Sequence, residues 1–510
     1  MKEWNIRGNS ILRCAFVGIS LLFQVGWLLL LVLRLKEYYA WISLVSGIVS
    51  LLLVLRLQSK HTTSAMKIPW IILILVFPVM GLSLYLMLLL FDDLGSAGRR
   101  MQRIQNQLQT ALPQNPQVLS LLEKEDLSVA NQFRYLSSHA GGGVYHNTQT
   151  QYYHEASDAF AALKESLEKA KNFIFMEYFI VSDTSSFREI QEILVRKARE
   201  GVEVRLMYDD IGSVGYVNLS FAKKLNAQGI RCRVFNPARP VLNVFQNHRD
   251  HRKITVIDGT VGYTGGYNLS DEYFDRSRSY GKWKDTGIRL EGDAVRSLTA
   301  NFLEIWNLSS WELTDDAFYL NVEKKLPADG FVQPYGDNPL AGERIAENVY
   351  LNMINGARKS LYLMTPYLII TDEMNRALCL AAKRGVDVRI ITPGIPDKKT
   401  VFAMTRSYYP GLASQGVRIF EYTPGFCHGK QCLCDGVLAS IGTSNFDYRS
   451  LYLHFENNVL MYKSSAVAQM AADFDSLFPL CREVTNAYTG HGKGILRTWQ
   501  CILRLFAPMV

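Results

Sequence analysis

Residues 251–268 read HRKITVIDGTVGYTGGYN, and residues 428–445 read HGKQCLCDGVLASIGTSN. Both stretches follow one pattern: H-x-K, four residues, D, six residues, then G-[GT]-x-N. The two His are 177 residues apart. One imidazole cannot easily attack a phosphorus atom and also protonate the group that leaves it, whereas two facing imidazoles can do both. The repeat therefore predicts one site that is built from both stretches.

The similarity continues in the segments that precede each stretch. The sequence AKNFIF at 170–175 matches ARKSLY at 357–362, and KAREGVEVR at 197–205 matches AKRGVDVR at 382–389. In the first copy an apolar strand at 173–176 is followed by a helical pattern and a second strand. Alternating strands and helices are typical of α/β folds. The chain is therefore expected to contain two duplicated α/β domains that are related by a pseudo-twofold axis.

The domain boundaries follow from composition. We expect a membrane region over 1–95, a polar amphipathic connector over 96–135, and duplicated domains over 136–320 and 330–510. Proline and glycine are frequent between 310 and 340, which predicts a linker there.

Three apolar runs without charge, at 14–33, 38–55 and 68–91, are long enough to be transmembrane helices. Pro78 and Gly81 predict a kink in the third run rather than a break. Three spans would place the N-terminus and the catalytic region on opposite sides. If the first run is peripheral, the other two form a hairpin that returns to the starting side.

Charge and cysteine usage narrow the class of protein. The net charge of +8 suits either nucleic acid or anionic lipid, and the apolar runs favour lipid. The eight Cys are scattered, which fits a reducing compartment better than a disulfide framework. Cys427, Cys432 and Cys434 lie near His428, but their spacing matches no usual zinc site. We therefore expect neither a metal nor a cofactor.

Two further segments are amphipathic. Met101, Ile104, Leu108 and Leu112 recur at helical spacing in the connector, which suits a helix on the lipid headgroups or one that packs on the catalytic domain. The segment 495–506 is also amphipathic and could lie on the membrane or close the second domain.

The residues of the repeated stretches suit phosphate chemistry. Alternation on a strand places His251 and Lys253 on one face, and the same holds for His428 and Lys430. The Lys ammonium groups would stabilise negative charge on a phosphodiester. The amides of Asn268 and Asn445 could donate hydrogen bonds to its oxygens.

These stretches resemble the HKD motifs of the phospholipase D superfamily. The segments NFDYRS at 445–450, FEN at 455–457 and WKD at 283–285, together with the N-terminal apolar hairpin, resemble bacterial cardiolipin synthases over roughly 38–510. The resemblance implies a phosphatidyltransferase that joins two phosphatidylglycerol molecules into cardiolipin, releases glycerol and needs no metal.

The resemblance also implies roles for individual residues. His251 would attack the phosphorus to form a phosphohistidine, and His428 would protonate the departing glycerol and then deprotonate the incoming hydroxyl. Downstream carboxylates would hold the imidazoles, and we assign Asp285 to the first imidazole and Glu456 to the second.

The remaining motif carboxylates, Asp258 and Asp435, are expected to support the fold by bonding to nearby backbone rather than to act in the chemistry.

Other functions are compatible with the motifs. A hydrolytic phospholipase D, or a transferase that uses another acceptor headgroup, is the nearest alternative. An HKD nuclease or a noncatalytic lipid-binding scaffold is more distant. We expect a multi-pass protein of the cell membrane with its catalytic domains in the cytoplasm, no nucleic-acid partner, and phosphatidylglycerol and anionic membrane lipid as its partners.

Overall fold

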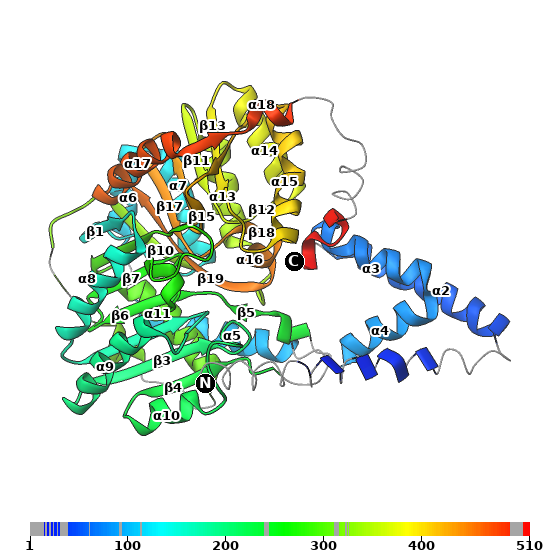
Figure 1. Cartoon of the computed structure of the whole chain (residues 1–510), viewed down its shortest axis with the longest axis horizontal. Helices are drawn as coiled ribbons and strands as arrows, with labels where there is room; N and C mark the ends of the chain where they lie inside the picture. The colour runs from blue at the N-terminus through cyan, green and yellow to red at the C-terminus, as the bar shows by residue number, and fades with distance from the viewer. Residues whose placement is uncertain are drawn as a thin grey trace.

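The computed structural model shows an α/β body made of two similar halves, from which N-terminal helices extend (Figure 1). It describes residues 15, 18–19, 22–23, 25–27, 29–30, 39–60, 62–90, 94–112, 115–238, 244–310, 316–321, 324, 326–489 and 503–509.

The first half is built around a seven-stranded sheet with the order β1-β9-β7-β6-β2-β3-β4. Its strands are β1 Thr148–Tyr153, β2 Phe173–Tyr178, β3 Glu203–Asp209, β4 Arg231–Phe235, β6 Lys253–Ile257, β7 Val261–Gly265 and β9 Gly287–Gly292. Its helices are α8 Ala156–Glu168, α9 Ser185–Arg199, α10 Phe221–Ala227, α11 Val295–Leu308 and α12 Asp316–Leu320, with the short turns η2 Val244–Asn247 and η3 Asp271–Phe274.

The second half repeats this topology in the order β10-β19-β17-β16-β11-β13-β14-β20. Its strands are β10 Phe331–Asp337, β11 Ser360–Met364, β13 Asp387–Pro393, β14 Arg418–Tyr422, β16 Gln431–Cys434, β17 Leu438–Gly442, β19 His454–Tyr462 and β20 Cys481–Glu483, with β12 Leu368–Ile369 and β18 Phe446–Asp447 paired separately. Its helices are α13 Ile345–Gly356, α14 Asp372–Lys383, α15 Lys399–Ala413, α16 Tyr448–Tyr452, α17 Ser465–Leu477 and α18 Thr485–Tyr488, with η4 Phe478–Leu480. The predicted duplication of an α/β unit is confirmed.

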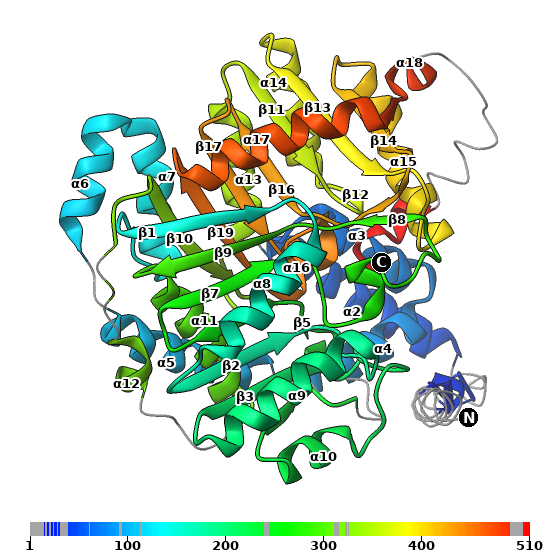
Figure 2. The ribbon, with the colours of Figure 1, turned by 60° about the vertical axis from the view of Figure 1, so that its left-hand side comes forward.

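Short strands join the two halves reciprocally. Strand β5 (Arg249–Asp250) pairs in parallel with β19 of the second half. Strand β15 (Gly425–Cys427) pairs in parallel with β8 (Lys282–Lys284) of the first half. Each half therefore sends the residues just before its motif His onto the other half, as a pseudo-twofold axis requires. In Figure 2, β8 of the first half reaches the yellow and orange elements of the second half.

The predicted linker at 310–340 is partly wrong. Residues 331–337 form β10, which pairs antiparallel with β19 over its full length. Pro334 is tolerated there because β10 lies at the edge of its sheet, where a missing backbone donor breaks no ladder on the outer side.

The N-terminal apolar runs form a group of helices beside the body (Figure 1). Half of the predicted span 14–33 lies outside the described residues, and the run at 38–55 corresponds to α2 (Tyr39–Ser59). Among the described residues, none of the helices combines the length and the apolar character that crossing a bilayer requires.

The third run is not one kinked helix, and that prediction is wrong. It forms α3 (Ser64–Val76) and α4 (Pro78–Leu90), which are separated at Phe77. A Cβ atom added to Gly81 would lie 2.6 Å from the carbonyl oxygen of Leu73. In one straight helix those residues would be about 12 Å apart along the axis. The chain therefore folds back at Phe77–Pro78, and the absence of a side chain at Gly81 permits the close packing.

The amphipathic connector packs on the catalytic body. Met101, Ile104 and Leu108 of α5 (Leu94–Ala111) are buried in the same core as Trp306 of α11. Helices α6 (Pro116–Glu125) and α7 (Leu127–His139) continue onto the second half, where Phe133 joins its core. The second of the two arrangements compatible with the sequence is therefore observed, because the apolar face of α5 packs on the body of the protein.

Residues 495–502 of the amphipathic C-terminal segment 495–506 lie outside the described residues. In the described part that follows, Leu503 and Ala507 are buried against the second half, and the Arg504 guanidinium lies 4.1 Å from the centre of the Tyr408 ring. This end, which includes η5 (Ala507–Met509), closes the second domain.

Candidate active site

The two motif His are tied by their backbone to the opposite half. His251 follows β5, and its N–H donates to the carbonyl of Phe455 at 2.9 Å. His428 follows β15, and its N–H donates to the carbonyl of Lys284 at 2.7 Å. Both side chains are buried. The predicted meeting of the two motifs in one site is therefore built into main-chain pairing between the halves.

Each imidazole bonds to a carboxylate of the other half. Nδ1 of His251 lies 2.9 and 3.0 Å from the oxygens of Glu456, and Nδ1 of His428 lies 2.7 Å from Asp285 Oδ2. The two carboxylates are the predicted ones, but their predicted assignment is reversed. The reason is the strand exchange, because β19 carries Glu456 to the first His and the segment after β8 carries Asp285 to the second.

Burial and nearby cations keep both imidazoles neutral. Burial lowers the pKa of His251 well below its usual value, and Lys253, His454, Lys430 and His428 lower it further. Burial also lowers the pKa of His428 to about 4, with Lys430 adding to the effect. His428 is among the causes that lower the pKa of His251, so the two His share one electrostatic environment. A neutral imidazole is the form that attacks an electrophile.

The two motif lysines lie in the same buried environment. Lys253 Nζ donates to the carbonyl of His251 at 2.6 Å, and Lys430 Nζ lies 2.8–2.9 Å from the ring nitrogens of His428. Burial lowers the pKa of Lys253 to about 7 and that of Lys430 to about 8. An anion between them would relieve this burial penalty, so the pair is prepared to receive a phosphodiester.

The pKa values of the two carboxyl groups are shifted in opposite directions. Burial opposes ionisation of Asp285, but the attraction of His428 and Lys430 prevails and lowers its pKa. Burial instead raises the pKa of Glu456 well above its usual value. The Thr443 hydroxyl also donates to Glu456. An ionised Asp285 can stabilise positive charge on His428, whereas Glu456 mainly fixes the orientation of His251.

The motif Asp residues lie away from the chemistry. Asp258 accepts hydrogen bonds from the backbone N–H groups of Lys171, Asn172 and Phe173 at 2.7–2.9 Å, at the start of β2. Asp435 accepts from the corresponding groups of residues 358–360 at the start of β11. Both have left-handed backbone, with φ of 51° and 53°. These are backbone contacts of the kind predicted for the two residues.

The motif Asn residues contribute differently from each other. Asn268 is held in the loop network, since it accepts from Ile180 N–H at 3.1 Å and donates to the Tyr273 hydroxyl at 2.9 Å. Asn445 is buried, and its Oδ1 has no hydrogen-bond partner in the described structure. An unpaired Oδ1 is an acceptor and cannot bond to a phosphate oxygen, so the predicted phosphate contact stays a prediction for both Asn residues.

Arg252 is a supporting residue that the sequence did not reveal. It is fully buried and donates to Glu304 at 2.9 Å, to the carbonyl of Asn301 at 2.6 Å and to the carbonyl of Glu456 at 3.2 Å. The second motif has Gly429 at this position, where an added Cβ would lie 2.9 Å from Met364. Arg252 therefore holds β19, the strand that carries Glu456, behind His251. Its only signal in the sequence is that the second motif has no arginine at the equivalent position.

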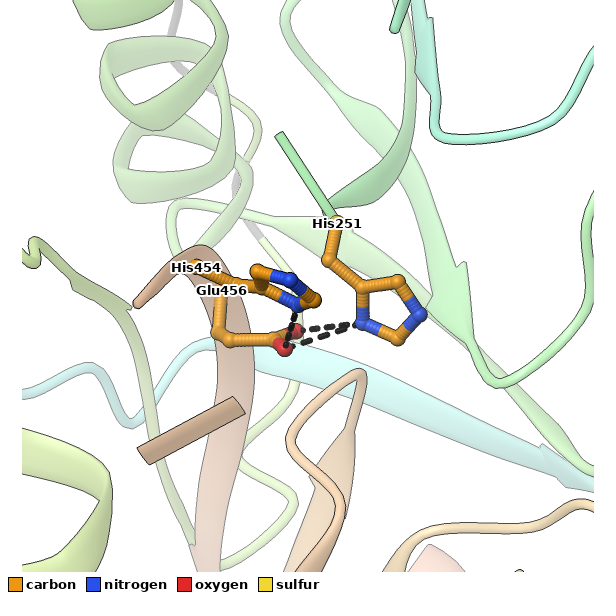
Figure 3. A group of neighbouring side chains, drawn as sticks. All are labelled: His251, His454 and Glu456. Atoms are coloured by element: carbon orange, nitrogen blue, oxygen red, sulfur yellow. Dashed lines mark hydrogen bonds and ion pairs between the residues drawn. The ribbon is translucent and has the colours of Figure 1, made fainter. Parts of the chain in front are cut away.

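His454 was also missed, although it lies two residues before Glu456. Figure 3 shows the Glu456 carboxylate between the imidazoles of His251 and His454. Ligand atoms of these three residues lie within 4.8 Å of one another, a spacing that a metal ion could bridge. However, burial lowers the pKa of His454, and the positive charges of Arg449 and Lys253 lower it further. The local charge therefore opposes a divalent cation.

Known proteins share this organisation. The family profile described as "Cardiolipin synthase, PLD-like domain" matches residues 163–306 and 350–478, and "Phospholipase_D-nuclease N-terminal" matches 45–88. An uncharacterised protein of Streptococcus mutans is 38% identical, covering 90% of this chain and 99% of that protein. Cardiolipin synthase 2 of Bacillus cereus is 35% identical (90% and 89%), and the cardiolipin synthase of Halalkalibacterium halodurans is 35% identical (83% and 84%).

A solved structure supports the fold alone. The crystal structure of phosphatidylserine synthase from Haemophilus influenzae superposes with a TM-score of 0.56 at 14% identity, covering 71% of this chain and 95% of that one.

Proposed function

The chain belongs to the cardiolipin synthase family of phospholipase D-like proteins, and we propose that it transfers a phosphatidyl group from one phosphatidylglycerol to the terminal hydroxyl of another, releasing glycerol. The observation that carries this proposal is the pair of motif imidazoles, each bonded to a carboxylate of the opposite half. One phosphodiester replaces another, so the reaction needs no nucleotide.

In the first step Nε2 of His251 attacks the donor phosphorus. Nδ1 of His251 is hydrogen-bonded to Glu456, which leaves Nε2 for the attack. A P–N bond forms, the P–O bond to glycerol breaks, and His428 gives its proton to the departing oxygen. Lys253 and Lys430 stabilise the charge on the phosphoryl oxygens. The donor is an anion, and its arrival raises the pKa of His428, so the imidazole can hold the proton that this step requires.

In the second step His428 accepts the proton of the acceptor hydroxyl, whose oxygen attacks the phosphorus as the P–N bond breaks. The contrast between the carboxylates supports these roles. Ionised Asp285 stabilises the imidazolium that an acid–base residue must form, whereas Glu456 holds a nucleophile that stays neutral until it attacks.

Residues 39–90 are proposed to hold the catalytic domains at the membrane. Large apolar side chains are exposed along α2 and α3, among them Trp41, Leu44, Leu52, Ile72 and Leu75. Such continuous apolar surface is typical of segments that contact lipid. We also propose a multi-pass arrangement in the cell membrane with cytoplasmic catalytic domains. The described cysteines are free thiols, which suits a reducing compartment.

The test is to supply the purified full-length protein with phosphatidylglycerol vesicles alone. Cardiolipin with an equal amount of glycerol is expected. Phosphatidic acid as the main product would instead establish a hydrolytic phospholipase D. A preference for phosphatidylethanolamine in mixed vesicles would show that this lipid, and not phosphatidylglycerol, is the acceptor. Cleavage of DNA without any lipid product would indicate a nuclease.

A further inference from the structure

The surroundings of the two catalytic imidazoles break the pseudo-twofold symmetry. Trp283, two residues before Asp285, has its ring 5.4 Å from that of His428. His454, two residues before Glu456, has its ring 5.4 Å from that of His251. One half therefore offers an indole face where the other offers a ring with two nitrogen atoms.

Aromatic side chains enclose His428 more completely. The rings of Tyr273 and Phe426 lie 5.4 and 5.9 Å from its ring, in addition to Trp283. His251 has one such neighbour besides His454, the ring of Phe179 at 5.0 Å. The polar side of the site is therefore the side of the proposed nucleophile.

His454 has a buried donor without an acceptor. Its Nε2 lies 3.4 Å from Arg449, which can only donate, so Nε2 accepts and Nδ1 carries the proton. Nδ1 has no hydrogen-bond partner among the described residues, and the nearest Glu456 oxygen is 3.7 Å away. The side chain is only 9% exposed. A buried unsatisfied donor is costly unless a ligand completes it.

Arg449 lies in α16, four residues after Asn445, and is half-buried. Within the described structure no carboxylate lies at ion-pair distance from its guanidinium, whose contacts are His454 and, at 3.3 Å, Asn247 Oδ1. The nearby carboxylate of Asp447 caps α16 by accepting from the N–H of Ser450.

Cations dominate the charge around His454, with the carboxylates of Glu456 and Asp447 as the nearby anions. After burial, Arg449, Lys253 and Arg249 are the largest causes that lower the pKa of His454. Of these cations, Arg249 is neutralised by Asp209 at 2.7 Å. The corresponding position in the first half, four residues after Asn268, is Glu272. The cation beside the site is therefore specific to one half.

We propose that Arg449 and His454 form a subsite for the phosphodiester of the acceptor lipid. This rests on the proposed function, in which the acceptor brings a second negative charge to a site that already holds the phosphorylated His251. At about 7 Å, the span of a glycerol bridge, repulsion between two such charges would slow the second step by roughly tenfold to a hundredfold at an effective dielectric constant near 20. The guanidinium offsets this repulsion for an anionic acceptor only.

The test compares an anionic acceptor with a neutral one in the same tube. Full-length protein in phosphatidylglycerol vesicles is given labelled glycerol, which is a neutral acceptor and re-forms labelled phosphatidylglycerol from the same intermediate. The readout is the ratio of cardiolipin to labelled phosphatidylglycerol, which is insensitive to the amount of folded enzyme. In Arg449→Gln this ratio is expected to fall roughly tenfold to a hundredfold, and Arg449→Lys should recover part of the loss.

Glu272→Gln, the matched change in the other half, should leave the ratio as in the wild type. His454→Phe should lower the ratio in the same direction as Arg449→Gln and serves as the second variant if the first does not fold. A parallel fall of both products in Arg449→Gln and His454→Phe, with an unchanged ratio, would overturn the subsite. A wild-type protein that makes labelled phosphatidylglycerol but no cardiolipin would instead overturn the proposed function.

Discussion

Replacement of Asp285 by Asn should selectively damage the departure of glycerol. Asp285 is fully buried, and its Oδ2 lies 2.7 Å from Nδ1 of His428. Asn keeps the shape but removes the charge that stabilises the imidazolium, and it can present an N–H where an acceptor is needed. With phosphatidylglycerol as donor we expect kcat to fall roughly 10³- to 10⁴-fold, equivalent to about 4–5.5 kcal/mol of transition-state stabilisation.

An activated donor distinguishes the roles of the two imidazoles. In a phosphatidyl ester of nitrophenol the leaving group departs without a proton, so general-acid assistance, worth about 10²–10⁴ in rate, is no longer needed. The release of nitrophenol in a single turnover should then be within about tenfold of wild type for Asp285→Asn. Glu456→Gln should remain slow, because His251 must still be oriented for its attack.

The opposite result would refute this reasoning. If Glu456→Gln were rescued by the activated donor and Asp285→Asn were not, the acid–base His would be His251. Equal rescue of the two variants would show that the carboxylates do not serve separate imidazoles. Unchanged circular dichroism and melting temperature in both variants are the control for folding.

Three further outcomes are expected. With a phosphate-labelled nitrophenyl donor, whose leaving group needs no proton from His428, and a denaturing quench at alkaline pH, which preserves the acid-labile P–N bond, His428→Ala should retain covalent label and His251→Ala should retain none. Label in the second variant alone would exchange their roles. The kcat/KM should decline as pH rises through 7–8, because Lys253, with a pKa of about 7, loses the charge that binds phosphate. Arg stays charged in this range, so Lys253→Arg should move the alkaline limb of the pH profile upward by roughly one pH unit. An alkaline limb that does not move would be due to another group. Asp258→Ala should lower the free energy of unfolding by about 2–4 kcal/mol in denaturant titration, because three backbone N–H groups lose a charged acceptor, with the rate per folded molecule unchanged.

The sequence alone determined what depends on neighbours along the chain. Strand and helix periodicity predicted the duplicated α/β unit, and the structure places β2, α9 and β3 where the first copy predicted them. The motif spacing identified the reacting side chains, and the structural role of Asp258 followed because a carboxylate that directly follows a strand can cap nearby backbone. These interactions are local, so residue order is sufficient to predict them.

Only the tertiary structure decided which carboxylate serves which His. His251 and Glu456 are 205 residues apart, and His428 and Asp285 are 143 apart. Their pairing depends on β5 docking on β19 and β15 docking on β8, and neither strand contact leaves a pattern in the sequence. The fold-back at Phe77, the burial of α5 and the polar corner of Arg449 and His454 have the same origin. Each depends on which surfaces meet when two similar halves close on each other, and a one-dimensional pattern does not specify that choice.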